Sequence, residues 1–276
     1  MEYKVAMPFR LNDPRIEEYA ELNVIFEKGK NNPTKFVEFL GQYENHRINI
    51  EFTNGIDYSL VDIANKISDK IYIRLTLQDI TRITVDKLKE HNCKFFCDSI
   101  FPAYNYTTLK SYLSLGVSDV YIADDLCYSL DNVKKICANN DVQIRLILNR
   151  IPSTSFTKGI SYETPIYRPQ DIDRLTPYYD VFELDCGRPY DWKRADVLYR
   201  VWFQEKHWNG EISEINPDLC IPFHDNSIIP DFTEYKLNCG FRCGSRPNPI
   251  CQKCEQFIHI GELLKEKSFA FKGKKA

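Results

Sequence analysis

The sequence repeats one structural unit at a nearly constant interval. Segments rich in Ile, Val, Tyr and Phe, which are typical of β-strands, recur every 23 to 25 residues, beginning near Ile48, Ile71, Lys94, Asp119 and Val142. Segments with apolar residues at helical spacing lie between them, at 60–67, 85–88, 109–113 and 130–136. This alternation favours a parallel sheet, because each helix must return the chain to the same end of the sheet. Candidate caps precede three helices: Asp57 or Ser59, Thr84 and Ser129.

Three further segments complete a set of eight strands. Residues 3–7, 179–185 and 219–223 have strand composition, and residues 192–206 have the spacing of a helix. Eight strands in 276 residues predict a (β/α)₈ TIM-like barrel, whose usual length is about 250 residues. The alternative is an open doubly wound sheet, which the absence of a Gly-rich phosphate loop disfavours. The predicted domains are the barrel, at 1–223, and a four-cysteine metal-binding loop with a helix packed on the barrel, at 224–276.

Two connections are longer than the others. Residues 10–32 contain four Asn and one Pro, and residues 150–178 are rich in Pro, Thr and Ser. Loops longer than about 12–15 residues usually serve a site or are disordered. We therefore expect both segments to be lids or substrate loops.

Polar residues gather where the predicted strands end. In βα barrels the chemistry takes place at the carboxyl ends of the strands. A buried arginine there requires a carboxylate neighbour or an anionic ligand, and this applies to Arg74 and Arg145. Carboxylates such as Glu51, Asp98 and Asp124 are candidate general acids or bases, and an arginine could clamp an anionic substrate group. The alternative is a structural ion-pair network. The candidate catalytic residues are Glu51, Arg74, Asp98, Asp124, Arg145 and Asp185.

The strongest local motif lies near the C-terminus. Cys239, Cys243, Cys251 and Cys254 place four thiols within sixteen residues, as C-x₃-C-x₇-C-x₂-C. Four thiolates on a short loop can hold tetrahedral Zn²⁺ or a [4Fe–4S] cluster, and the spacing does not choose between them. The alternative is four reduced thiols without a metal. We predict metal binding, because this density of cysteines normally indicates a metal site.

One stretch resembles a known family. Residues 109–124, a helix ending in Leu-Gly-Val followed by a strand ending in Asp124, are similar to the peptidase U32 family, and the resemblance extends over about residues 45–190. It implies a barrel and favours an iron–sulfur cluster over zinc. It also implies modification of RNA bases or of a ubiquinone precursor. The cysteines of that family are more widely spread through the barrel, so no catalytic residue is carried over.

Composition limits the partners. A formal net charge of -3 provides no global positive field for nucleic acid or anionic lipid. The N-terminus does not have the pattern of a signal peptide, and no apolar run approaches the ~20 residues of a membrane span. We therefore expect a cytoplasmic protein with a small-molecule or RNA substrate and no membrane partner.

Two functions remain open from the sequence. The first is a metal-binding βα-barrel enzyme of undetermined reaction. The second is a non-catalytic barrel on which zinc stabilises a C-terminal surface for a protein or nucleic-acid partner. The basic residues that motivate the second are Lys265, Lys267, Lys272, Lys274 and Lys275.

Overall fold

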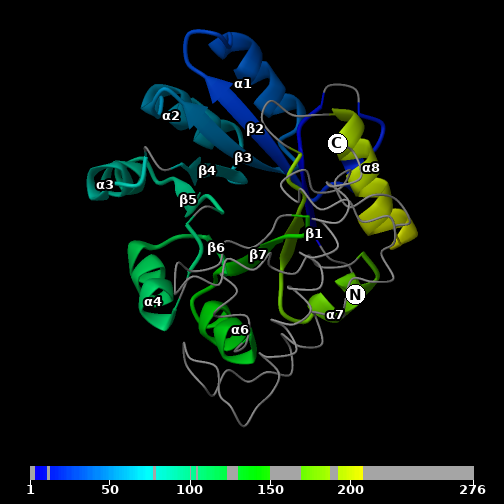
Figure 1. Ribbon diagram of the computed structural model, residues 1–276. Helices are drawn as coiled ribbons and strands as arrows, with labels where there is room; N and C mark the ends of the chain where they lie inside the picture. Colours follow the sequence, from blue (N-terminus) through cyan, green and yellow to red (C-terminus); the bar gives the residue numbers. More distant parts are fainter. Residues whose placement is uncertain are drawn as a thin grey trace, which may run out of the picture. The chain divides into compact units, whose positions relative to one another are not determined.

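The computed structural model describes residues 4–10, 13–76, 79–99, 101–103, 105–122, 130–149, 169–186 and 192–207 (Figure 1). They group into two compact units. The first comprises the described residues of 4–122, 134–146 and 179–183, and the second comprises those of 130–133, 147–178 and 184–207. The predicted domain boundary after residue 223 lies outside the described residues.

The described residues form one eight-stranded sheet. Its order is β5-β4-β3-β2-β1-β8-β7-β6, and its registered strand pairs are parallel. The two end strands also approach each other, because the Ser118 N–H donates to the Phe95 carbonyl at 2.8 Å and Ala103 bridges to Ile122. The sheet is therefore a nearly closed parallel barrel, which confirms the predicted architecture. The strands are β1 Lys4–Pro8, β2 Glu21–Glu27, β3 Arg47–Thr53, β4 Ile71–Leu75, β5 Lys94–Cys97, β6 Asp119–Tyr121, β7 Gln143–Ile147 and β8 Val181–Glu183.

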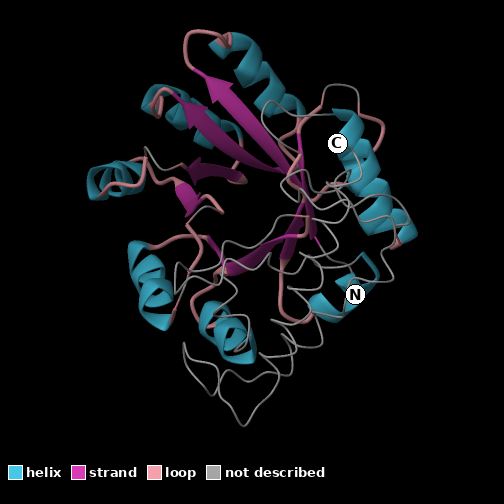
Figure 2. Cartoon of the chain, viewed as in Figure 1, coloured by secondary structure: helices cyan, strands magenta, loops and turns pink. Residues whose placement is uncertain are grey.

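Helices alternate with the strands along the chain from β2 onward. Figure 2 shows those of the first unit on the outer side of the sheet. The helices are α1 Pro33–Gln42, α2 Tyr58–Ile67, α3 Arg82–Glu90, α4 Tyr106–Leu115 and α6 Leu130–Ala138. Apolar residues on their inner faces are buried against the strands, for example Leu40, Leu60 and Leu109.

Side-chain caps begin four of these helices. Asn32 accepts hydrogen bonds from the backbone N–H groups of Thr34 and Lys35, and Asn105 caps α4. Asp57 caps α2, as one of the two predicted alternatives. The predicted cap Thr84 is wrong, because Thr84 lies inside α3 and donates its N–H to the true cap, Thr81. Ser129 lies outside the described residues.

The first long connection is not a loop throughout. Residues 21–27 form β2, which pairs with β3 along its whole length, and the only helical element described between β1 and β2 is the 3₁₀ turn η1, Ile16–Glu18. The prediction treated this segment as a loop, although Leu22, Val24 and Phe26 occupy alternate positions as a strand requires. The barrel reaches eight strands with β2, so the segment 219–223, which lies outside the described residues, is not needed as the eighth.

The second unit contains the remaining helices. The described end of the second long connection is helical, with η2 Pro169–Asp171 and α7 Ile172–Leu175. The predicted helix over 192–206 is confirmed as α8 Trp192–Tyr199, continued by the π-helical turn η3 Arg200–Glu205. Lys206 binds Asp173 within this unit, with Nζ 2.7 Å from Oδ1.

Two glycines give a matched test of backbone conformation. Gly116 ends α4 with φ of 78°, a left-handed conformation that costs an L-residue energy, whereas Gly41 lies inside α1 in open space. Gly116→Ala should lower the free energy of unfolding by about 1 kcal/mol, and Gly41→Ala should raise it by about 0.5 kcal/mol. Urea unfolding of both variants checks this, and equal effects at the two positions would contradict it.

Candidate functional site

The interior of the barrel is charged rather than apolar. Alternate residues of a strand share one face, so Arg47, Asn49 and Glu51 of β3 point to the same side. Ion pairs join strands that are not neighbours in the sheet, such as β7 to β2 and β3 to β6. Only side chains that project into a barrel can meet in this way. These contacts join three arginines to four carboxylates, and we call this set the interior network: Arg47, Arg74, Arg145, Glu21, Asp98, Asp119 and Glu183.

Arg145 lies at the centre of the interior network, with 0% of its side chain exposed. Its Nη1 lies 2.7 Å from Glu21 Oε2 and 3.2 Å from Asp119 Oδ1, and its Nη2 lies 3.2 Å from Glu183 Oε2. Its guanidinium also lies 4.8 Å from the centre of the Phe96 ring. A guanidinium buried to this extent must be paired, and three carboxylates meet that need.

Arg47 extends the interior network toward the amino ends of the strands. Its Nη2 lies 2.5 Å from Asp119 Oδ2, and its Nε donates to Asn49 Oδ1 at 3.0 Å. The guanidinium stacks on the Tyr72 ring, 3.5 Å from its centre. Stacking and hydrogen bonds hold the Arg47 guanidinium in place at this end of the barrel, which suits a structural role.

Arg74 extends the interior network toward the carboxyl ends. Its Nε donates to Asp98 Oδ2 and its Nη1 donates to Glu183 Oε1, both at 2.7 Å. Asp98 directly follows β5, where the chemistry of βα barrels is located. Its other carboxylate oxygen, Oδ1, accepts from Ser99 Oγ at 3.1 Å. Glu51 is the register partner of Arg74 on β3 and is 4% exposed.

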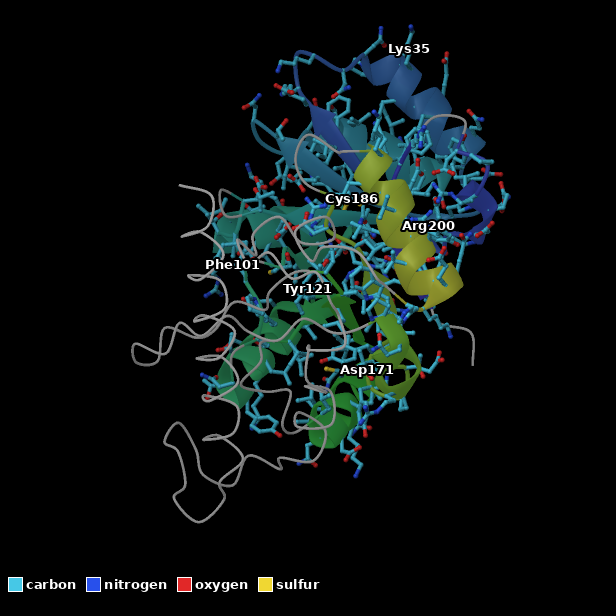
Figure 3. All side chains as sticks on the ribbon, turned by 45° about the vertical axis from the view of Figure 1, so that its right-hand side comes forward. Lys35, Phe101, Tyr121, Asp171, Cys186 and Arg200 are labelled. Atoms are coloured by element: carbon cyan, nitrogen blue, oxygen red, sulfur yellow. The ribbon has the colours of Figure 1, made fainter. Side chains whose placement is uncertain are left out.

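Burial and charge act in opposite directions on the carboxylates. Burial by itself would raise the pKa of Asp119, but the guanidinium groups of Arg145 and Arg47 outweigh it and hold that pKa below its ordinary value. The pKa of Glu183 is lowered in the same way, with burial opposed by Arg74 and Arg145. Burial raises the pKa of Tyr121, whose hydroxyl donates to Glu183 Oε2 at 2.7 Å. Tyr121 is labelled in Figure 3. Because their pKa values are lowered, Asp119 and Glu183 are both ionised at neutral pH.

Four of the six candidate catalytic residues lie on the barrel strands or directly after them. Arg74 and Arg145 have the carboxylate neighbours that the sequence required, and Asp98 is one of those neighbours. Arg145 lies too deep to meet a substrate, whereas Glu51, Arg74 and Asp98 lie toward the carboxyl ends. A catalytic role for each of them stays a prediction.

The other candidates lie elsewhere. Asp185 belongs to the second unit, where its backbone N–H donates to Asn149 Oδ1 at 2.7 Å and its carbonyl accepts from Asn149 Nδ2 at 2.8 Å. Asp124 and the four cysteines Cys239, Cys243, Cys251 and Cys254 lie outside the described residues. Within the described part of the chain, no group of three or more His, Cys, Asp or Glu side chains is placed to hold a metal ion.

Four charged members of the interior network are not among the candidate catalytic residues, and one of them, Glu183, lies at the carboxyl end of β8. Glu21 lies in the strand that was expected to be a loop. Arg47 and Asp119 lie at the amino ends of β3 and β6, and the search covered only the carboxyl ends. The sequence did hold a signal for Arg47 and Asp119. Alternate residues of a strand lie on the same face, so Arg47 shares a face with Glu51, and Asp119 shares one with Tyr121.

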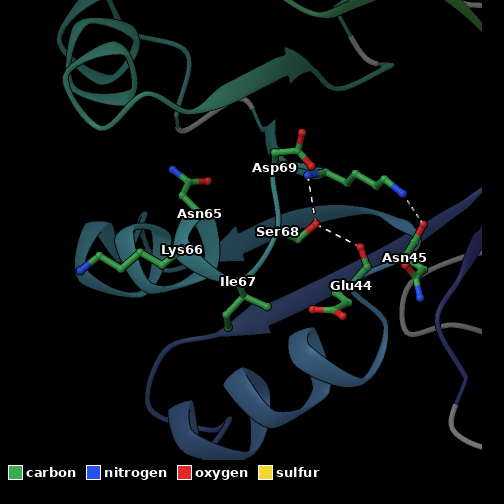
Figure 4. Close-up of a pocket in the computed structure, with 8 residues that line it drawn as sticks. Glu44, Asn45, Asn65, Lys66, Ile67, Ser68 and Asp69 are labelled. Atoms are coloured by element: carbon green, nitrogen blue, oxygen red, sulfur yellow. Dashed lines mark hydrogen bonds between the residues drawn. The ribbon is translucent and has the colours of Figure 1, made fainter.

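A surface pocket of about 360 Å³ lies at the amino ends of β3 and β4 (Figure 4). It is formed by the turns before these strands, and Ser68 Oγ donates across it to the Glu44 carbonyl at 3.1 Å. Lys70 Nζ donates to the Asn45 carbonyl at 2.8 Å. The pocket is at the opposite end of the strands from Asp98, so it is separate from the candidate site.

The chain matches no family model, and no curated protein matches it. The resemblance to the peptidase U32 family therefore stays a prediction. None of the described helices is both long and apolar enough to cross a membrane.

Proposed function

We propose that this protein is a βα-barrel enzyme whose reaction takes place at the carboxyl ends of the strands, and that its four C-terminal cysteines bind a metal centre. The observation that carries the proposal is the buried Arg74–Asp98 pair, with Nε and Oδ2 2.7 Å apart, at the ends of β4 and β5. Apolar residues of similar volume would stabilise this position as well or better. A buried ion pair at the catalytic end of a barrel is therefore better explained by chemistry than by stability.

Asp98 and Glu51 are the acid–base candidates of this site. Arg74 donates a hydrogen bond to Oδ2 of Asp98. This contact holds the Asp98 carboxylate close to the carboxyl ends of the strands. A carboxylate in this place can accept a proton from a substrate hydroxyl or amine. The substrate class that we propose is a small molecule or an RNA base.

The four C-terminal cysteines are the candidate ligands of the proposed metal centre. Four thiolates in a C-x₃-C-x₇-C-x₂-C motif fit an iron–sulfur cluster or Zn²⁺ in number and chemistry. An iron–sulfur cluster would supply redox chemistry to the enzyme, whereas zinc would hold the C-terminal segment together. We favour the cluster because of the resemblance to the peptidase U32 family.

Metal analysis tests the proposal. Protein purified without oxygen should be brown and contain iron and sulfide, and both should be lost in the Cys239→Ala/Cys254→Ala double variant. The matched control is Cys93→Ala/Cys137→Ala, which removes two buried thiols of the first unit and should keep the colour. A colourless protein with one zinc would indicate a structural zinc site instead of a cluster. A protein without metal would contradict the cofactor proposal.

The catalytic part is tested separately from the metal. Asp98→Asn keeps the size of the side chain and its ability to accept from Arg74, so it should fold and retain the metal. Nucleosides and small metabolites from cells that carry the wild type, Asp98→Asn or the double cysteine variant are compared by mass spectrometry. A product present only with the wild type supports the enzyme, and identical profiles in all three contradict it.

A further inference from the structure

One part of the interior network connects a buried hydroxyl to the candidate site. The Tyr121 hydroxyl donates to Glu183 Oε2 at 2.7 Å. The other oxygen of the same carboxylate, Oε1, accepts from Arg74 Nη1, also at 2.7 Å. Arg74 then donates through Nε to Asp98 at 2.7 Å. The contacts therefore run in an unbroken series from β6 through β8 and β4 to the end of β5.

Each step in this series restricts the orientation of the next group. Glu183 is buried, with 3% of the residue exposed, and also accepts from Arg145 Nη2 at 3.2 Å, so both of its oxygens are held by named donors. A guanidinium is planar, and its five N–H donors form a rigid fork. Because the guanidinium is rigid, a hydrogen bond from Nη1 to Glu183 restricts the directions open to Nε, the donor that meets Asp98.

We infer that Tyr121 and Glu183 are positioning residues for the proposed site, holding the plane of Arg74 so that Asp98 keeps its orientation at the carboxyl ends of the strands. This inference rests on the proposed function for its meaning in catalysis. The orientation itself is a physical property that can be measured without knowing the reaction. Supporting groups of this kind matter because catalytic side chains must be held close to their productive geometry.

The chain offers a matched control for Tyr121. Tyr19 is also buried, and its hydroxyl donates to a carboxylate oxygen, Asp13 Oδ2, at 3.0 Å. Phenylalanine at either position removes one buried hydroxyl and one hydrogen bond to a carboxylate. The two variants should therefore lose similar global stability, but only Tyr121→Phe changes the series that reaches Arg74.

The experiment measures hydrogen exchange of the Arg74 Nε–H group by NMR of the full chain labelled at arginine. Exchange should be slow in the wild type and in Tyr19→Phe. It should be about tenfold faster in Tyr121→Phe, the change expected when a hydrogen bond of ordinary net strength is lost. Glu183→Gln, which removes the charge that Arg74 meets, should accelerate exchange further.

The outcomes separate positioning from stability. Equal exchange rates at Arg74 in Tyr121→Phe and Tyr19→Phe, together with equal melting temperatures, would show that Tyr121 serves stability alone and would overturn the inference. Failure of the proposed function looks different. In that case Asp98→Asn would leave the metabolite and nucleoside profiles unchanged while the Arg74 exchange still responded to Tyr121→Phe.

Discussion

Replacement of Arg145 by methionine should lower the free energy of unfolding by about 3–5 kcal/mol, the usual cost of removing one partner from a buried ion pair. Methionine fills much of the volume of the arginine side chain, so the loss is not mainly a cavity effect. It arises because Glu21, Asp119 and Glu183 would lose the guanidinium that they share in the interior, where the pKa values of Asp119 and Glu183 are held low partly by Arg145. Urea unfolding at neutral pH, followed by circular dichroism, measures this loss.

The same substitution at Arg82 is the control. The Arg82 side chain is 91% exposed, and its Nε lies 3.8 Å from Asp86 Oδ2 one turn away on α3. Exposed pairs of this kind contribute little, so Arg82→Met should change the free energy of unfolding by less than about 0.5 kcal/mol. If Arg145→Met cost no more than Arg82→Met, the interior network would not be holding the barrel together.

The sequence predicted the barrel well where its strands are apolar. The segments that begin near Ile48, Ile71 and Lys94 carry enough Ile, Phe and Tyr to be recognised, and they form β3, β4 and β5. β2 was missed although Leu22, Val24 and Phe26 occupy alternate positions, as the apolar residues of β3 do. Polar residues that face the interior leave this alternation in place, so the sequence did hold a signal for the strand.

The sequence predicted the need for ion pairs but not the partners. A buried Arg74 must meet a negative charge, and the structure supplies Asp98 from the next strand, 24 residues away. Its second partner, Glu183, is 109 residues away along the chain. Side chains this far apart meet only once the barrel closes, and no local pattern encodes which strands will face each other across its interior.

The pH dependence of stability should reveal the interior network directly. Asp119 and Glu183 have ordinary pKa values of 3.8 and 4.5, and both are lowered in the folded protein. A carboxylate whose pKa is lowered on folding stabilises the protein above its ordinary pKa, and this contribution is lost as the pH falls through the lowered value. The wild type should therefore lose stability as the pH falls below about 4.5.

Arg145→Met should change this dependence in a defined direction. Without the guanidinium, burial is opposed less strongly, so the pKa values of Asp119 and Glu183 rise and both groups take up protons at higher pH than in the wild type. Protonation then removes negative charge that Arg145 no longer offsets, and the stability difference from the wild type should shrink by more than about 1 kcal/mol between neutral and acid pH, since one pKa unit corresponds to about 1.4 kcal/mol. Urea unfolding of the wild type, Arg145→Met and Arg82→Met across this range measures the difference. A gap that stayed constant as the pH fell would mean that the loss at Arg145 comes from packing and not from buried charge.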